Sequence, residues 1–160
     1  LDALKTGLES GRAVPEIREA ALFGALGGSG WEWIALAWAA GGAWLLWRRV
    51  VPWPVPTATL ASALVLSTLF WLLDPAGQAP PQQHLAAGAL VLGAFFIATD
   101  PVSGCASVRG RLIFGCGVAL ITLVIRRWGA YPDGVAFAVL LMNMAAPFID
   151  RYTRPRVYGR

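Results

Sequence analysis

The chain alternates long apolar runs with short polar breaks, and the spacing of these segments predicts its elements. About 20 apolar residues in a helix cross the roughly 30 Å of hydrocarbon in a bilayer. Five apolar windows approach that length: Trp31–Trp47, Trp53–Leu73, Leu85–Thr99, Leu112–Ile125 and Val135–Ile149. All but the second are short for a full span. We therefore expect these helices to extend into their flanks, to tilt, or to cross only in part.

The breaks between the windows carry residues that end helices. RRVVPWPVP (48–56) places paired arginines before prolines that suit a first helical turn, and RRWGAYPDG (126–134) has the Gly and Pro-Asp-Gly chemistry of a tight turn. Barrel strands would be shorter and would alternate polar with apolar residues. The pattern therefore predicts an all-α integral membrane protein with about five transmembrane helices.

The segment FFIATDPVSGCASVRGRLIFG (95–115) places a polar insert between two apolar runs. Its Thr-Asp-Pro-Val-Ser-Gly run interrupts a helix and leaves backbone groups that lipid cannot satisfy, so the insert must face protein or a water-filled cavity. Discontinuous helices of this kind often build the central site of transporters with inverted repeats. The sequence thus predicts a broken helix near Asp100, which is either a capped interfacial loop anchored by Arg109 and Arg111 or a polar lining.

Composition agrees with a membrane location. Apolar residues make up 57% of the chain, eight residues are tryptophan and the mean hydropathy is +0.59, which a soluble domain of 160 residues could not bury. The charged residues lie between or at the ends of the apolar windows. The pI of about 9.7 therefore reflects orientation in a membrane and does not indicate nucleic-acid binding.

The distribution of basic residues predicts the orientation, because cytoplasmic loops are enriched in Lys and Arg. If the C-terminus is cytoplasmic, eight arginines lie on the inner side of the membrane: Arg48, Arg49, Arg109, Arg111, Arg151, Arg154, Arg156 and Arg160. The other side receives five basic residues: Lys5, Arg12, Arg18, Arg126 and Arg127. We therefore expect a multi-pass protein with its C-terminus in the cytoplasm and with residue 1 outside the cell or in the periplasm.

Three regions follow from these patterns. Residues 1–30 are expected to form an interfacial amphipathic segment and a loop that leads into the first span, 31–150 the transmembrane helical domain, and 151–160 a basic cytoplasmic tail. The opening LDALKTG has no initiator Met, basic n-region or cleavage site, so it does not resemble a signal peptide. The chain is expected to be a piece of a longer protein.

Three polar residues in or beside the windows are candidates for an ion path. Asp100 is either an N-cap for the following helix or a carboxylate that faces a cation. Glu32 is either an interfacial residue or part of an ion path, because acids within a membrane are usually functional. Asn143 either bonds a neighbouring helix or lines a pathway.

Other polar residues have plainer interpretations. Asp133 is expected to be a turn and N-cap residue, and Asp150 with Arg151 a pair at the membrane exit. His84 lacks the further ligands that a metal site needs, so no metal site is predicted. Cys105 and Cys116 have no CxxC spacing and are expected to pack as small apolar residues, although a cluster shared with another protein of a complex stays open.

Several stretches of the chain carry a family resemblance. LGAFFIATDPVS, RGRLIFG and VIRRWGAYPDGVAFAVLLMNMAAPFID, with GGSGWEW and LLWRRVVPW before them, resemble the C-terminal half of the family that contains the D subunit of the Rnf electron-transport complex. That family is related to the B subunit of the sodium-pumping NADH:quinone reductase. The resemblance implies one inverted repeat of a urea-transporter-like fold.

The resemblance also implies a function. Members couple electron transfer between ferredoxin and NAD to translocation of Na⁺ or H⁺, work with the other subunits of the complex, and carry FMN on a threonine through a phosphoester. No matching threonine motif occurs here, so the anchor is expected upstream of Leu1, and a second, non-covalent flavin stays open. Thr99, Asp100 and Ser103 are the implied polar lining for flavin or ion.

The chain itself lacks the motifs of a complete active site. It has no Walker loop, Rossmann glycine pattern or nucleophile triad. NADH and ferredoxin chemistry is therefore expected in other subunits, and this chain is expected to be a flavoprotein part of a translocase. The alternative is a passive channel or secondary transporter of the urea-transporter type.

Overall fold

The computed structural model describes residues 6–7, 10–11, 30–75, 77–129 and 133–153, and within them the secondary structure is helical, with no strand. Most of the predicted interfacial segment before residue 30, and the basic tail after Thr153, lie outside the described residues. The all-α prediction is confirmed for the part of the chain that the structure describes.

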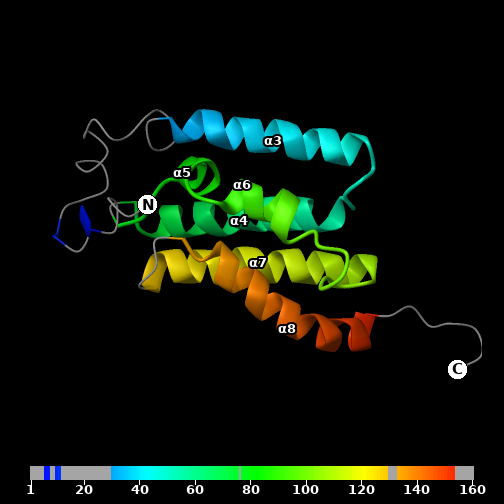
Figure 1. Cartoon of the computed structure of the whole chain (residues 1–160). Coiled ribbons are helices and arrows are strands. Elements are labelled where there is room, and N and C mark those ends of the chain that lie inside the picture. Colours follow the sequence, from blue (N-terminus) through cyan, green and yellow to red (C-terminus); the bar gives the residue numbers. More distant parts are fainter. Residues whose placement is uncertain (1–5, 8–9, 12–29, 76, 130–132, 154–160) are drawn as a thin grey trace, which may run out of the picture.

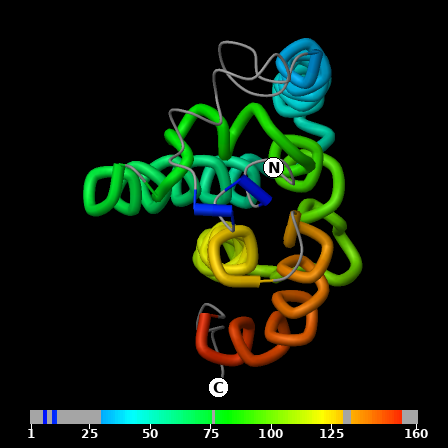
Figure 2. The backbone as a smooth tube through the Cα atoms, turned by 90° about the vertical axis from the view of Figure 1, so that its left-hand side faces the viewer, coloured from blue at the N-terminus to red at the C-terminus, as the bar shows by residue number. Residues whose placement is uncertain are grey.

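Four long helices and one broken segment make up residues 31–153 as far as the structure describes them. In chain order the elements are α3 (Trp31–Trp47), α4 (Pro54–Leu73), α5 (Pro81–Ala86), α6 (Leu90–Leu92), the π-helix η1 (Gly93–Ile97), α7 (Val108–Trp128) and α8 (Val135–Thr153). Successive segments run back and forth along one long axis (Figure 1). Viewed from the left-hand side of that picture, α3 and α7 appear end-on whereas α4 extends sideways, so α4 crosses the others obliquely (Figure 2).

Local chemistry sets the helix ends. Pro54 and Pro56 occupy the first turn of α4, where a missing backbone N–H is tolerated. Ser107 caps α7, because its Oγ accepts a hydrogen bond from the Gly110 N–H at 2.9 Å. At the end of α3, the N–H of Arg49 donates to Leu46 O and that of Val50 to Leu45 O, both at 3.0 Å. This is the pattern of a Schellman cap.

Three of the helices, α4, α7 and α8, are long and apolar enough to cross a membrane. Helix α3 has 17 residues, which makes it about 26 Å long and short of a full hydrocarbon thickness. The first, second and fifth predicted windows begin at or within one residue of α3, α4 and α8, and α7 extends the fourth window in both directions.

The third predicted window differs from expectation, because Leu85–Thr99 does not form one helix. It divides into the end of α5, the single turn of α6 and the π-turn η1. Ala87 is extended with φ −104° and ψ 137°, and Gly88 has a φ of 80°, a left-handed conformation that glycine adopts freely. The chain therefore contains a break at 87–89 in addition to the predicted break near Asp100.

Small residues bring the helices of the core close together. A side chain at Gly115 of α7 would meet the Cβ of Ala58 and the carbonyl of Val55 at 2.8 Å, so α4 and α7 pack backbone to backbone there. Gly42 of α3 lies directly against the ring of Phe95 in η1. The first contact joins α4 to α7 and the second joins α3 to the broken segment, and Phe114, Leu90 and Val118 are fully buried in the core.

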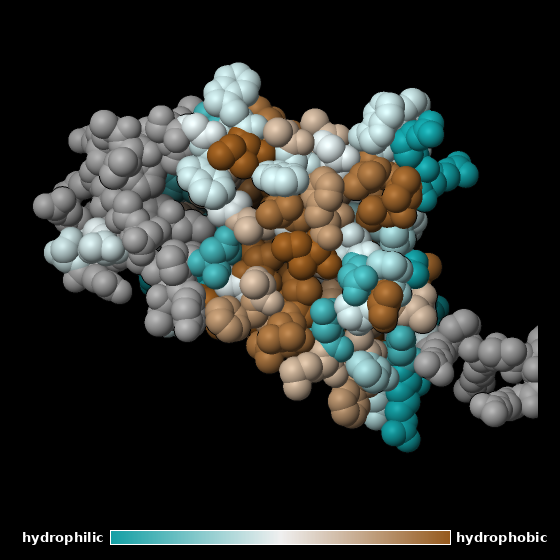
Figure 3. All heavy atoms as spheres, in the orientation of Figure 1, coloured by the Kyte–Doolittle hydropathy of each residue, from teal (hydrophilic) through white to brown (hydrophobic). Residues whose placement is uncertain are grey.

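The outer surface is largely apolar. Hydrophobic side chains cover the middle of the face in Figure 3, and hydrophilic ones gather toward its right-hand end. Trp33 is 76% exposed and Leu73 is 75% exposed. Many other large apolar residues along α3, α4 and α8 are also exposed. Such a surface is compatible with contact with lipid or with another protein, and in water it would promote aggregation.

Candidate functional site

The chain leaves the helix after η1 in a turn organised by Asp100. Its Oδ2 accepts hydrogen bonds from the Ser103 Oγ at 2.6 Å and the Ser103 N–H at 3.1 Å, and Oδ1 accepts one from the Val102 N–H at 3.3 Å. The Ser103 hydroxyl, with the backbone N–H groups of Val102 and Ser103, lowers the pKa of this exposed carboxyl. Asp100 is therefore an ionised cap for the turn at 100–104.

The same loop is fastened to α7 and α8. Both carboxylate oxygens of Asp150 accept the Ala106 N–H at 3.0 Å, and the Ser107 Oγ bonds to Thr153 Oγ1 at 2.8 Å. The Arg111 Nε donates to the Cys105 carbonyl at 3.0 Å. Asp150 thus anchors the loop, a role different from the predicted pair with Arg151, which is exposed.

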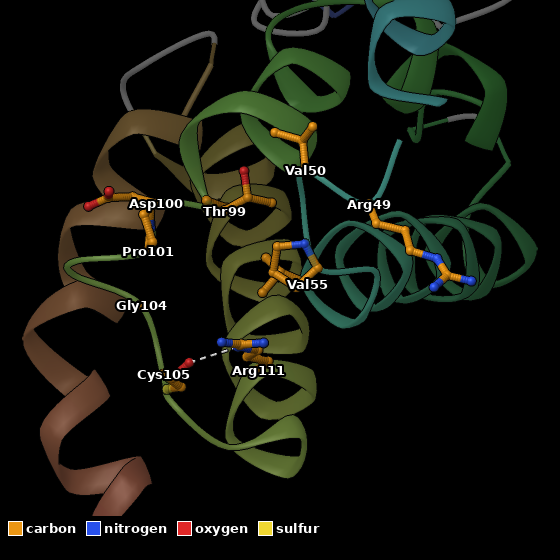
Figure 4. Close-up of a pocket in the computed structure, with 11 residues that line it drawn as sticks. Arg49, Val50, Val55, Thr99, Asp100, Pro101, Gly104, Cys105 and Arg111 are labelled. Atoms are coloured by element: carbon orange, nitrogen blue, oxygen red, sulfur yellow. Dashed lines mark hydrogen bonds between the residues drawn. The ribbon is translucent and has the colours of Figure 1, made fainter. Parts of the chain in front are cut away.

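A cavity of about 280 Å³ opens beside this loop. It lies where the α3–α4 turn meets the turn between η1 and α7 (Figure 4). Its lining residues are Arg49, Val50, Pro52, Val55, Ala98, Thr99, Asp100, Pro101, Gly104, Cys105 and Arg111. Burial raises the pKa of the Cys105 thiol to about 11, so this sulfur is neutral at physiological pH.

A second polar cluster holds the break at 87–89. The side chain of Arg126 is 1% exposed, donates to His84 O at 2.6 Å and Ala87 O at 3.4 Å, and forms an ion pair with Asp133 Oδ1 at 3.2 Å. The other carboxylate oxygen of Asp133 accepts the Ala89 N–H at 2.5 Å. Two residues that flank the α7–α8 turn thus satisfy backbone groups that the break would leave without partners.

Asp133 also has part of the role expected from the sequence. Its Oδ1 accepts the Val135 N–H at 3.3 Å at the start of α8. The predicted turn role is therefore observed, together with the ion pair to Arg126, but Asp133 is not the N-cap residue itself, because Gly134 directly precedes α8.

His84 lies beside this cluster without a side-chain partner. Its Nδ1 is buried and has no hydrogen bond among the described residues, and the same holds for both amide atoms of Gln83. Burial, with a smaller contribution from the nearby Arg126 charge, lowers the pKa of His84 to about 4. Within the described residues, no three His, Cys, Asp or Glu side chains lie close enough to share a metal ion.

The structure groups some of the predicted site residues and separates others. Thr99 and Asp100 line the cavity, and Ser103 contacts Asp100. Helix α3, which carries Glu32 in its first turn, begins at the opposite end of the molecule from this cavity (Figure 1). Asn143 is half-buried on α8 and makes no side-chain hydrogen bond within the described part of the chain.

Two features were not predicted from the sequence. One is the burial of Arg126, which the sequence pattern places only in a loop. The other is the pairing of Asp150 with a backbone N–H 44 positions away. For the burial of Arg126, the nearest sequence signal is an acidic residue seven positions later, across a turn that contains Gly and Pro. The contact of Asp150 with a distant backbone N–H has no sequence signal.

Comparison with known proteins gives a consistent result. The sequence profile described as "NQR2, RnfD, RnfE family" matches residues 1–159. The chain is 54% identical over 160 residues to the D subunit of an ion-translocating oxidoreductase complex in Escherichia fergusonii and 52% identical to the D subunit of the same name from Escherichia coli O1:K1. Each alignment covers 99% of this chain and 46% of the relative, so the chain spans about half the length of these curated relatives.

Proposed function

Because the chain belongs to the NQR2, RnfD, RnfE family, we propose that it forms part of a membrane subunit of an ion-translocating oxidoreductase complex of the Rnf type. The observation that carries this proposal is the family match over 1–159, in a chain with three helices able to cross a bilayer. The complex would couple electron transfer between ferredoxin and NAD to movement of Na⁺ or H⁺.

The polar residues at the two ends of the bundle are the proposed ion path. Asp100, with Thr99 beside it, would meet the ion at the end that carries the cavity, and Glu32 would meet it at the other end. Asn143, within α8, is the proposed polar residue between them. The exposed Asp100 carboxylate is ionised, which supports an electrostatic role toward a cation.

The described threonines from Thr57 onward are hydrogen-bonded to nearby carbonyls or buried. The hydroxyls of Thr57, Thr68, Thr99 and Thr153 donate to carbonyls of their own helices at 2.7 to 2.8 Å. Thr59 and Thr122 are fully buried. We propose that the threonine that carries FMN precedes Leu1.

Location and partners follow the same proposal. The protein would lie in a bacterial inner membrane with its C-terminus in the cytoplasm, in contact with the other subunits of the complex. Redox chemistry would then occur on cofactors that this and neighbouring subunits position.

The test uses the full-length protein in its complex. After denaturing electrophoresis, we expect flavin fluorescence on the band of this protein, and inverted membrane vesicles supplied with reduced ferredoxin and NAD should accumulate Na⁺ or H⁺. A band without fluorescence, together with solute flux that needs no electron donor, would favour a passive channel of the urea-transporter type.

A further inference from the structure

The cavity between the α3–α4 turn and the η1–α7 turn has room for a ligand and two cationic groups, Arg49 and Arg111, that the proposed ion path does not use. We propose that it binds the headgroup of an anionic phospholipid, with Arg111 contacting the phosphate oxygens and Arg49 the ester oxygens of the attached glycerol. This inference concerns lipid binding and does not depend on the redox function.

The charges around the cavity favour an anion. Arg111 uses only its Nε, toward the Cys105 carbonyl, and neither Arg111 nor Arg49 forms an ion pair with a carboxylate of the described residues. Asp100, the carboxylate in the lining, already accepts three hydrogen bonds from its own turn. At the opposite end of the bundle, by contrast, both Arg126 and Arg127 have carboxylate partners.

The backbone of Arg49 is a second and independent observation. Its φ of 56° makes it the one residue other than glycine with a positive φ in the part of the chain that the structure describes. The left-handed position of a Schellman cap favours glycine, because a Cβ is strained there. Because glycine would end α3 here with less strain, an arginine at this position indicates that its side chain has a further role.

The cavity also lies at one end of the bundle, where a bilayer crossed by α4 and α7 would have its headgroups. It is bounded by the end of α3 and the starts of α4 and α7, where the apolar helices stop. Trp47 and Trp53, 71% and 58% exposed, flank the α3–α4 turn as interfacial tryptophans do. Basic pockets between transmembrane helices on the cytoplasmic side are typical sites for anionic headgroups.

The arrangement of the two arginines favours a lipid over a small free anion. In Figure 4, Arg111 points toward the Cys105 carbonyl, whereas Arg49 extends along the other side, away from Asp100. The apolar side chain of Val55 lies between them. A phospholipid offers both a phosphate and the ester oxygens of its glycerol to such a divided site, whereas inorganic phosphate offers a single group.

The test measures lipid retained by the full-length protein in its purified complex. Native mass spectrometry and thermal unfolding are followed in detergent with added phosphatidylglycerol, phosphatidylcholine or inorganic phosphate. We expect phosphatidylglycerol to be retained and to raise the unfolding temperature, and the other two to have little effect. Loss of one cationic contact should weaken retention roughly fivefold.

Three variants make the test specific. Arg49→Gly should lose lipid while its unfolding temperature without lipid is unchanged or higher, because glycine relieves the strained backbone. Arg111→Gln should lose lipid as well, and Arg109→Gln, an exposed arginine at the same end outside the lining, should retain it. Equal retention of both phospholipids, equal retention by Arg49→Gly and wild type, or full stabilisation by phosphate alone would overturn the proposal.

Discussion

Arg126 is a charged side chain buried at the end of an otherwise apolar helix. It is stable there because one carboxylate and two carbonyls surround its guanidinium. Removing one partner of a buried ion pair leaves an uncompensated charge, which usually costs about 3 to 5 kcal/mol. At the scale of the residue, the Arg126–Asp133 pair is therefore the contact most sensitive to substitution.

Asp133→Asn should lower the stability of the full-length protein by about 3 kcal/mol or more, because the buried guanidinium loses its counter-charge. Thermal unfolding of the purified complex measures this loss. The matched control is Arg127→Gln, whose partially exposed side chain lies 3.9 Å from Asp74 and should matter by less than about 1 kcal/mol. Equal effects of the two variants would contradict the buried-pair interpretation.

His84 provides a prediction about pH. Its pKa in the folded protein is about 4, below the 6.5 of the unfolded chain, so the unfolded state takes up a proton first as the pH falls. The contribution of His84 to stability is complete above pH 6.5 and is lost as the pH falls toward 4.

Replacing this side chain should remove that part of the acid sensitivity. At about pH 5 the loss in wild type amounts to about 2 kcal/mol relative to about pH 7.5. His84→Gln should therefore show a smaller drop in unfolding temperature between these two pH values. An identical drop in both proteins would show that His84 is accessible to protons in the folded state.

At the scale of the element, the packing of α3 against η1 depends on one glycine of an adjacent pair. Gly42→Ala would place a Cβ on the ring of Phe95, whereas the Cβ of Gly41→Ala would lie 3.4 Å from Phe96 Cζ. Overpacking typically costs about 1 to 3 kcal/mol. Gly42→Ala should therefore lower the unfolding temperature of the complex and Gly41→Ala should leave it nearly unchanged; the reverse order would contradict the observed packing.

The sequence predicted the continuous helices well and the broken one only in part. Apolar run length located α3, α4, α7 and α8, because a membrane helix satisfies its backbone from within. The break at Asp100 was visible in its Pro and Gly neighbours. The break at 87–89 was missed, since Ala and Gly are compatible with an apolar window and the groups that stabilise it, on Arg126 and Asp133, lie 39 and 44 positions away in the chain.

The candidate site was predictable to a similar extent. Thr99, Asp100 and Ser103 were located together from their spacing alone, because they are neighbours in the chain. The contributions of Arg49 and Asp150 depend on contacts between distant segments, and no local pattern indicates them.

At the scale of the whole molecule, the predicted alternation of sides matches the arrangement of the elements. The α3–α4 turn, the η1–α7 turn and the end of α8 lie at one end, and the ends of α4 and α7 lie at the other (Figure 1). Arg48, Arg49, Arg109, Arg111 and Arg151 thus share an end. Which end faces the cytoplasm stays a prediction from the basic residues.

Single cysteines can determine that orientation. In a background with Cys105 and Cys116 replaced, Val102→Cys and Leu73→Cys would place exposed thiols at opposite ends, since the native side chains are 89% and 75% exposed. An impermeant maleimide should label Val102→Cys in inverted vesicles and Leu73→Cys in intact spheroplasts. Labelling of Val102→Cys from outside would reverse the proposed topology.

The break at 87–89 has a consequence for biosynthesis. A continuous apolar helix can leave the translocon for lipid as soon as it is made, but the carbonyl of Ala87 and the N–H of Ala89 have their partners on Arg126 and Asp133. Those residues emerge from the ribosome later. We therefore expect the segment from α5 to η1 to remain in contact with protein until α7 has been synthesised, and to enter the bilayer together with α7.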